Sequence, residues 1–387
     1  MHQRVIFVSH SVRLYGASRS LLALLEGFRQ HAIDTCTILP GTGLMQDALA
    51  ARGLASAIVP FPCWVAHETE PADVHALRAA QARAVPALVD VIEAWRPDVV
   101  WSNASVTAVG ALAAAALGLP HIWHLREVSG DAYPFRFIEG TAAAAALLHT
   151  AQARIAVSAA VGAAYEALGS GPCSVIYNGV GDAAALVARS TLRPRQGRLR
   201  MLLPGRVRED KGQLAAIEAT QRLITAGHDV ELRIVGDGES LLCEDAIARL
   251  GLRDAVTLTG IVADLEAEYR QADMALACST IEGMGRTTAE AMSYGLPVVG
   301  FRGLGTTEMI EHDVTGLLCD ASAAALARAV EGLVMQPDVA RRLGDRARLA
   351  AQRRFSNEQY TRASLDVLRR VAPPATLAAE CEAVRLS

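Results

Sequence analysis

Short apolar runs alternate with longer amphipathic stretches along most of this chain. One amphipathic stretch, residues 18–28, places Leu21, Leu22, Leu25 and Phe28 on one stripe, as expected for a helix that packs on a core. In the first half, the runs that read as strands are Val5–Val8, Thr37–Leu39, Ala57–Val59, Val99–Trp101, His121–Trp123, Ile155–Val157 and Ser174–Tyr177. Strands and helices in alternation predict a doubly wound parallel sheet.

A second series of strands follows an interruption. Residues 179–197 contain Gly181, Pro194 and Gly197 and no clear strand, so we predict a linker there. The later strand-like runs are Met201–Leu203, Leu232–Val235, Val256–Leu258, Met274–Ala277 and Val298–Gly300. We therefore expect an α/β protein with two Rossmann-like doubly wound domains, residues 1–178 and 198–355.

Two helical stretches carry further expectations. The long one at residues 74–95 contains Pro86, which predicts a bend or a break. Residues 338–370 read as helical to the end. We expect 356–387 to form a C-terminal helix and tail that returns to the first domain, with the tail loosening after Pro373 and Pro374.

The composition excludes several classes of protein. The 387 residues are 51% hydrophobic and 20% charged, enough apolar material for real cores, which excludes a wholly disordered chain. The net charge is −4, and neither half is basic, since residues 1–178 have 11 Arg against 13 acids and residues 179–387 have 26 basic residues against 28 acids. A nucleic-acid partner is therefore not expected.

Cysteines and hydropathy bear on location. The seven cysteines are scattered and form no C-x-x-C pair, which favours reduced, mostly buried thiols. The longest apolar stretch, residues 106–119, has about 14 residues, whereas a membrane span needs about 20. With no signal peptide at its start, the protein is expected to be cytoplasmic.

Residues 341–370 carry nine Arg against three acids. This basic stretch could form a solvated face, or it could contact the inner membrane peripherally, and both interpretations remain open.

The strand-to-helix loops are where chemistry is expected, because ligands of open α/β sheets bind beyond the carboxyl ends of the strands. The loop after Met201–Leu203 contains Arg206 and Lys211, and Lys211 is the single lysine beside 36 arginines. Two cations in one such loop suit a diphosphate. The alternative is an ordinary solvated loop.

A second loop, residues 279–292, follows Met274–Ala277. It contains Gly283 and Gly285, and the helix after it would offer unpaired N–H groups to phosphate. Glu282 and Glu290 stand eight residues apart there. Thr287 and Glu290 also have capping-box spacing, a structural explanation of Glu290, and Glu282 alone could be a turn residue.

Two positions in the first half are weaker candidates. Gly16 lies between the first strand and the first helix, where glycine serves either turn chemistry or a close approach to phosphate. His124 follows a predicted strand, and a lone histidine of this kind can equally be structural. There is no G-x-G-x-x-G, no Walker loop, no D-x-D, no H-E-x-x-H and no G-x-S-x-G, which disfavours nicotinamide, metal-diphosphate and elbow-serine chemistry.

The ordered set of motifs resembles the retaining glycosyltransferases of family 4, which have the GT-B fold, and the resemblance covers nearly the whole chain. Residues 282–292 look like the family's E-x7-E signature with its trailing E-A-M, and residues 295–299 look like G-x-P-V-V. Gly205-Arg206 and Lys211-Gly212 resemble its diphosphate clamp, and residues 178–180 its N-G-V element. Residues 15–18 depart from the commoner double-glycine loop, and Met284 and Arg286 replace the frequent Phe and Leu.

The resemblance implies two facing domains with a central cleft and a nucleotide diphosphate sugar, UDP- or GDP-linked, as donor. Glu290 would bind the ribose. Arg206, Lys211 and the backbone of Gly283, Met284, Gly285, Arg286 and Thr287 would stabilise the leaving diphosphate without a metal or other cofactor. Gly16 would approach the phosphates, and Glu282 and His124 would hold sugar hydroxyls. The acceptor would be a carbohydrate, a lipid-linked molecule or a small molecule.

Bacterial relatives favour surface polysaccharide or lipopolysaccharide synthesis. A natural-product glycosyltransferase, a sugar-nucleotide epimerase and an inactive GT-B binding partner are the rival interpretations. The sequence leaves open the donor base and sugar, the acceptor and linkage, and the oligomeric state.

Overall fold

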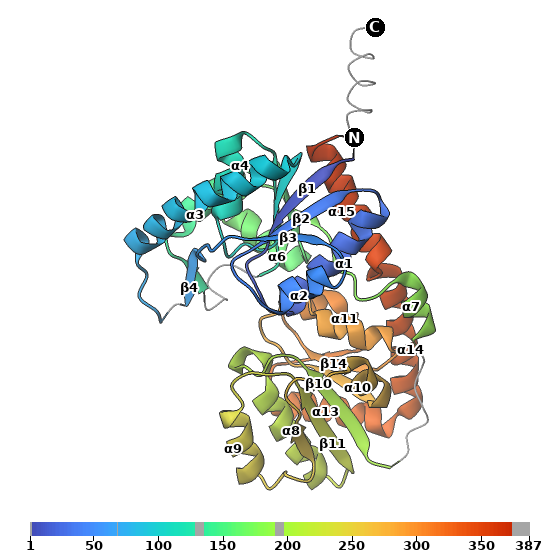
Figure 1. Cartoon of the computed structure of the whole chain (residues 1–387). Helices are drawn as coiled ribbons and strands as arrows, with labels where there is room; N and C mark the ends of the chain where they lie inside the picture. Colours follow the sequence, from blue (N-terminus) through green and yellow to red (C-terminus); the bar gives the residue numbers. More distant parts are fainter. Residues whose placement is uncertain (1, 68, 128–134, 190–196, 374–387) are drawn as a thin grey trace. The chain divides into compact units, whose positions relative to one another are not determined.

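The computed structural model describes residues 2–67, 69–127, 135–189 and 197–373 (Figure 1). The chain divides into two compact units. Unit 1 comprises Met1–Gly179 together with the chain from Asn357, and unit 2 comprises Val180–Ser356. The residues expected as a linker include a helix, α7 (Ala183–Ala188), that belongs to unit 2, and residues 190–196 of that stretch lie outside the described residues.

Unit 1 is built on a seven-stranded parallel sheet. In sheet order its strands are β3 (Ala55–Ile58), β2 (Asp34–Leu39), β1 (Arg4–Val8), β5 (Val99–Ser102), β6 (His121–Leu125), β8 (Ala153–Ala156) and β9 (Ser174–Val175). A small antiparallel pair, β4 (Val65–His67) with β7 (Phe135–Phe137), was not predicted. Its helices are α1 (Gly16–Gln30), α2 (Leu44–Ala50), α3 (Val74–Trp95), α4 (Val109–Leu117), α5 (Thr141–His149), α6 (Ala159–Ala167) and α15 (Asn357–Val371).

Unit 2 is built on a six-stranded parallel sheet. In sheet order its strands are β12 (Val256–Leu258), β11 (Val230–Val235), β10 (Leu199–Pro204), β13 (Met274–Ala277), β14 (Val298–Phe301) and β15 (Leu317–Cys319). The helices, besides α7 and a 3-10 turn at Glu209–Lys211, are α8 (Gln213–Thr225), α9 (Leu241–Arg249), α10 (Leu265–Gln271), α11 (Arg286–Ser293), α12 (Leu304–Met309), α13 (Ala323–Met335) and α14 (Pro337–Arg354).

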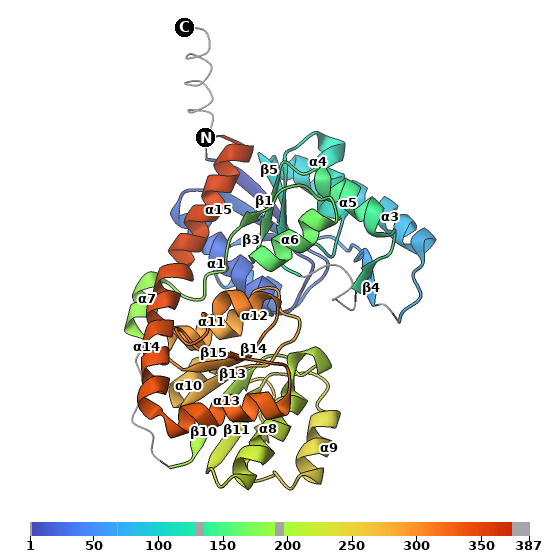
Figure 2. The same cartoon turned by 180° about the vertical axis from the view of Figure 1, so that it is seen from behind.

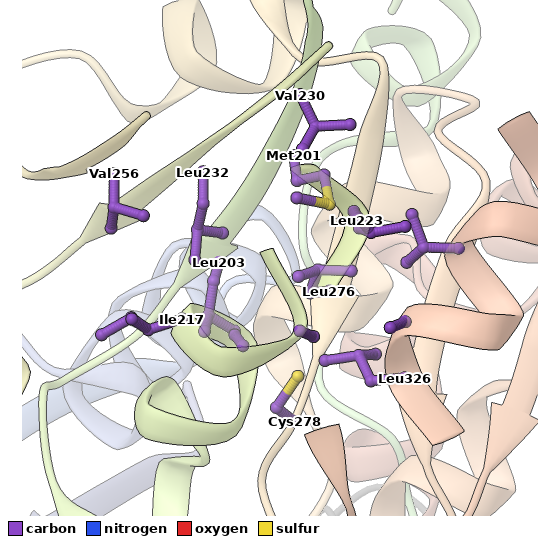
Figure 3. Packing of buried hydrophobic residues seen from close by; sticks show 14 of the residues in the cluster. Met201, Leu203, Ile217, Leu223, Val230, Leu232, Val256, Leu276, Cys278 and Leu326 are labelled. Carbon is purple, nitrogen blue, oxygen red and sulfur yellow. The ribbon is translucent and has the colours of Figure 1, made fainter. Parts of the chain in front are cut away.

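Apolar side chains of unit 2 fill the space between the sheet and its helices (Figure 3). Leu203 and Leu232 from adjacent strands meet Ile217 of α8 and Leu326 of α13 in one buried cluster. Burying one such side chain stabilises the fold by about 1.5–3 kcal/mol. This core fixes β10 and β13 side by side, and the two loops that leave their carboxyl ends carry the candidate site.

One helix expectation needs correction. A break at Pro86, one of the two outcomes expected there, does not occur, because α3 runs as one helix of 22 residues. The basic stretch 341–370 is divided between α14 of unit 2 and α15 of unit 1, next to the boundary expected after residue 355, and α15 packs against α1, as Figure 2 shows. No helix in the described part of the chain is both long and apolar enough to span a bilayer.

Candidate active site

The loop after β10 holds the single lysine. Arg206 is exposed, and its carbonyl accepts a hydrogen bond at 3.0 Å from the side chain of Gln213, which begins α8. The loop is also supported from β11, because the backbone N–H of Val207 donates to the carbonyl of Asp237 at 2.7 Å. A Cβ on Gly236 would lie 2.1 Å from the carbonyl oxygen of Gly205, so glycine is required at this close approach.

The loop after β13 leads into α11. Gly285 precedes the helix with φ +81°, a left-handed conformation that favours glycine. The loop is braced by α12, since the N–H of Gly305 donates to the carbonyl of Glu282 at 2.9 Å. Met284 is 3% exposed, so the residue as a whole presents little surface. This arrangement directs the start of α11, with its positive dipole end, beyond the sheet.

The two loops are joined by an ion pair. The Lys211 Nζ donates to Glu282 Oε2 at 2.8 Å and to Ser279 Oγ at 3.2 Å. The side chains of Lys211 and Glu282 are 22% and 27% exposed, so a ligand can reach both. The structure therefore brings together two residues that the sequence placed in separate loops.

Asp210 orders the same loop. Burial would raise the pKa of its carboxyl, but the hydrogen bond from Arg208 and the charges of Lys211 and Arg208 lower the pKa below its usual value. Arg208 binds both carboxylate oxygens, with Nη2 2.6 Å from Oδ2. The carbonyl of Asp210 also accepts from the N–H of Thr280 at 3.0 Å, which ties the lysine loop to the loop after β13.

Glu290 is buried and does not close a capping box. Thr287 lies inside α11, whose N-cap is Gly285, so the capping interpretation is wrong. The carboxylate instead accepts hydrogen bonds at 3.0 Å from Arg286 Nε and at 3.0 Å from the hydroxyl of Tyr269. The side chain of Glu290 is 4% exposed, and it lies in the second turn of α11.

The two candidates of unit 1 have different surroundings. Gly16 is the first residue of α1 and is exposed, as a backbone contact to phosphate requires. His124 is fully buried at the end of β6, against Trp101 and Tyr360, and Arg126 Nη2 lies 3.4 Å from its Nδ1. Burial, together with the charge of Arg126, lowers its pKa well below the usual value. The enclosure of His124 is compatible with its structural interpretation, and its contact with a sugar hydroxyl stays a prediction.

Sequence reasoning missed Tyr269 and Arg189. Tyr269 is 2% exposed and contacts Glu290 from α10. Arg189 ends α7 and donates to Ser293 Oγ at 2.7 Å. Neither residue is in a glycine-containing strand-to-helix loop, and their role depends on packing between elements, so no local signal could have found them. Within the described residues, no group of three His, Cys, Asp or Glu side chains is arranged to hold a metal ion.

Comparisons with known proteins bear on the family and the fold. Residues 14–183 match the family model described as Glycosyltransferase Family 4, and residues 198–336 match the one described as Glycosyl transferases group 1. The structure is similar to that of HepE from Anabaena in complex with UDP-glucose, with a TM-score of 0.81, 23% identity, and coverage of 95% of this chain and 100% of that one.

Curated relatives match over shorter segments. One is N-acetyl-alpha-D-glucosaminyl L-malate synthase from Bacillus anthracis, 30% identical over 159 residues, which cover 40% of this chain and 42% of the relative. Another is the lipopolysaccharide core biosynthesis glycosyltransferase LpsE from Rhizobium meliloti, 31% identical over 166 residues, 42% of this chain and 48% of the relative. The chain thus spans less than half the length of these two relatives in each alignment.

Two Rossmann-like units with this site define a protein of the GT-B fold. Within that class, the chain belongs to the glycosyltransferases of the family-4 type.

Proposed function

We propose that this protein is a retaining glycosyltransferase that moves a sugar from a nucleotide diphosphate sugar to an acceptor hydroxyl. The observation that carries the proposal is the convergence of Lys211, Glu282 and the start of α11 at the carboxyl ends of β10 and β13. A cation beside a helix N-terminus favours a diphosphate. The Anabaena neighbour was solved with UDP-glucose, which makes a UDP-sugar the first candidate and a GDP-sugar the second.

Each residue has a proposed role in this reaction. Lys211, Arg206 and the backbone N–H groups of residues 283–287 stabilise the charge that develops on the leaving diphosphate, so no metal is required. Glu290 binds the ribose hydroxyls and Glu282 binds sugar hydroxyls. Gly16 contributes its backbone to phosphate binding. His124 remains a candidate for a sugar hydroxyl, since its buried Nε2 has no hydrogen-bond partner among the described residues.

The chemical step conserves the configuration at the sugar. The bond between the anomeric carbon and the phosphate oxygen breaks, and the acceptor oxygen forms a bond to the same face of that carbon. The acceptor proton passes to an oxygen of the leaving diphosphate. The protein supplies positioning and charge stabilisation, so a pair of carboxylates like that of a glycosidase is not needed.

The acceptor is proposed from the relatives alone. The LpsE match favours a role in bacterial lipopolysaccharide or surface polysaccharide synthesis. A cytoplasmic location, with peripheral contact at the inner membrane, is part of the proposal. The name of the Bacillus anthracis relative refers to L-malate, so a small-molecule acceptor is the second candidate.

The first test is a thermal-shift screen of the purified chain with UDP, GDP, ADP and dTDP, each with and without EDTA. A nucleotide at 100 times its Kd should stabilise the folded protein by about 2.7 kcal/mol. We expect one nucleotide to do so equally in EDTA. Incubation of the matching nucleotide sugar alone then separates an epimerase, which converts it without an acceptor, from a transferase. A folded sample that binds none of the four nucleotides would contradict the proposal and favour an inactive binding partner.

A further inference from the structure

Glu290 is held at both of its carboxylate oxygens by side chains from two helices. Arg286, on the same helix, donates to Oε1, and the hydroxyl of Tyr269, from α10, donates to Oε2, each at 3.0 Å. The Tyr269 hydroxyl also lies 3.3 Å from the carbonyl oxygen of Thr287 in the first turn of α11. An ionised carboxylate can accept about four hydrogen bonds, so being held in this way is compatible with binding hydroxyl donors.

Tyr269 is itself held by a second tyrosine. Its ring stacks on that of Tyr294, with ring centroids 5.2 Å apart and planes 12° apart. Tyr294 directly follows α11, the helix that carries Glu290, and burial raises the pKa of its hydroxyl to about 12. The stack therefore joins α10 to the end of α11 through two buried rings.

Arg189 supports this stack from the segment where the chain enters unit 2. Its guanidinium carbon lies 4.7 Å from the centroid of the Tyr294 ring, within the range of a cation–π contact. It also donates to Ser293 Oγ at 2.7 Å and to the carbonyl of Val180 at 3.2 Å. Its side chain is 11% exposed, so these contacts are sheltered from water. Val180 is the first residue of unit 2.

We propose that Tyr269 is a positioning residue that fixes the Glu290 carboxylate for the ribose hydroxyls, and that Arg189 supports it through Tyr294. The inference rests on the proposed function, in which Glu290 binds ribose. A glutamate side chain has several rotatable bonds, and fixing them before the ligand arrives removes an ordering penalty from binding. Without the hydroxyl of Tyr269, the Glu290 side chain keeps only one of these two described supports.

The test measures how strongly the protein prefers a ribose with hydroxyls. The wild-type chain, Tyr269→Phe and Tyr294→Phe are compared by calorimetric titration with UDP and with 2′,3′-dideoxy-UDP, and the GDP pair is run in parallel. Tyr269→Phe keeps the ring stack and removes the hydroxyl that reaches Glu290. Tyr294→Phe is the matched control, since it removes a hydroxyl from the same stack that has no described contact with Glu290. Melting curves verify that each variant is folded.

We expect Tyr269→Phe to reduce the preference for the ribose form by about tenfold, in line with the loss of one hydrogen bond to a charged group. Affinity for the dideoxy form should stay the same, and Tyr294→Phe should retain the wild-type preference. Arg189→Gln provides a second variant and should reduce the preference in the same direction, by about threefold, since it acts through Tyr294.

The outcomes separate the two proposals. A wild-type chain that binds none of these nucleotides contradicts the proposed function and the positioning role with it. A wild-type preference for ribose that Tyr269→Phe leaves unchanged overturns the positioning role alone. An equal loss of affinity for the ribose and dideoxy forms shows a merely structural role for Tyr269 and also overturns it.

Discussion

The Nζ of Lys211 lies 2.8 Å from Oε2 of Glu282, although the two residues are 71 positions apart in the chain. The pair exists because β10 and β13 are hydrogen-bonded neighbours, and each releases a loop at its carboxyl end. A lysine at this place presents a compact positive charge, which under the proposed function would face the diphosphate of the donor.

Replacement of the lysine tests its role in the chemical step. Lys211→Ala should lower the kcat for sugar transfer by about 100-fold, with a smaller change in KM, because about 3 kcal/mol of charge stabilisation is lost in the transition state. Steady-state kinetics with the nucleotide sugar identified in the binding screen measures both constants. The matched control is Arg198→Ala, which removes an exposed cation of unit 2 that precedes the same strand. A kcat that is unchanged in folded Lys211→Ala would remove Lys211 from the mechanism.

The turn after Lys211 requires glycine for two separate reasons. Gly212 has φ +70°, and a Cβ there would lie 2.2 Å from the carbonyl oxygen of Cys278 in the neighbouring loop. Gly251 has the same φ of +70° and nothing within 4 Å, so it isolates the backbone penalty. Gly251→Ala should lower the free energy of unfolding by about 1–2 kcal/mol, and Gly212→Ala should lower it by about 1–3 kcal/mol more.

Equilibrium unfolding in urea measures both glycine variants against the wild type. Gly212→Ala should also reduce nucleotide binding, because the displaced turn carries Lys211. Equal losses of stability in the two variants would show that the Cys278 contact yields without penalty.

A glycine on α12 shapes the loop that is proposed to bind the diphosphate. A Cβ on Gly305 would lie 2.5 Å from the carbonyl oxygen of Gly283, so alanine there must push the loop away. Gly305→Ala should reduce the stabilisation by the nucleotide in a thermal-shift titration. Gly332→Ala, in α13 with nothing within 4 Å, is the matched control. It should retain binding and stabilise the fold by about 0.5–1 kcal/mol, and a similar result for Gly305→Ala would contradict the prediction.

Three histidines of unit 1 make its stability depend on pH. Burial lowers the pKa of His10 and of His124, and lowers the pKa of His121 to about 3. The charge of Glu127 raises the pKa of His10 and the charge of Arg126 lowers it, but burial has the largest effect. Below pH 6.5 the unfolded chain binds protons that the folded chain does not. The free energy of unfolding should therefore fall as pH falls below 6.5, by up to about 1.4 kcal/mol per pH unit for each histidine.

Urea unfolding at a series of pH values between 7.5 and 5 measures this slope. His121→Gln should make the slope shallower because one proton fewer is taken up on unfolding. An equal slope in His121→Gln and the wild type would contradict the prediction. It would show that His121 takes up a proton as readily in the folded chain as in the unfolded chain.

Short continuous apolar runs predicted most strands of both sheets. A parallel strand that is buried on both faces needs such a run, as in residues 5–8 and 274–277. The loops that carry Lys211 and Glu282 could be predicted for the same reason, since they directly follow such strands. The short strands β4 and β7 have no run of this length, and their pairing depends on residues some 70 positions apart, such as Val65 and Phe137.

The surroundings of the carboxylates could not be predicted from local patterns. Thr287 and Glu290 have the spacing of a capping box, but the left-handed Gly285 starts the helix earlier and places Thr287 inside it. The partner that replaces the cap, Tyr269, comes from a different helix. His124 was placed correctly at the end of its strand, but the aromatic rings of Trp101 and Tyr360 that enclose it come from distant parts of the chain.

The return of the last helix to unit 1 affects the order in which the protein can fold as it is made. Tyr360, Leu365 and Leu368 of α15 lie in the same buried cluster as Phe7, which is near the other end of the chain. A ribosome releases all of Val180–Ser356 before α15, so unit 2 can fold during synthesis from one uninterrupted segment. Unit 1 is synthesised first but completes its core last, after the whole of unit 2 has emerged.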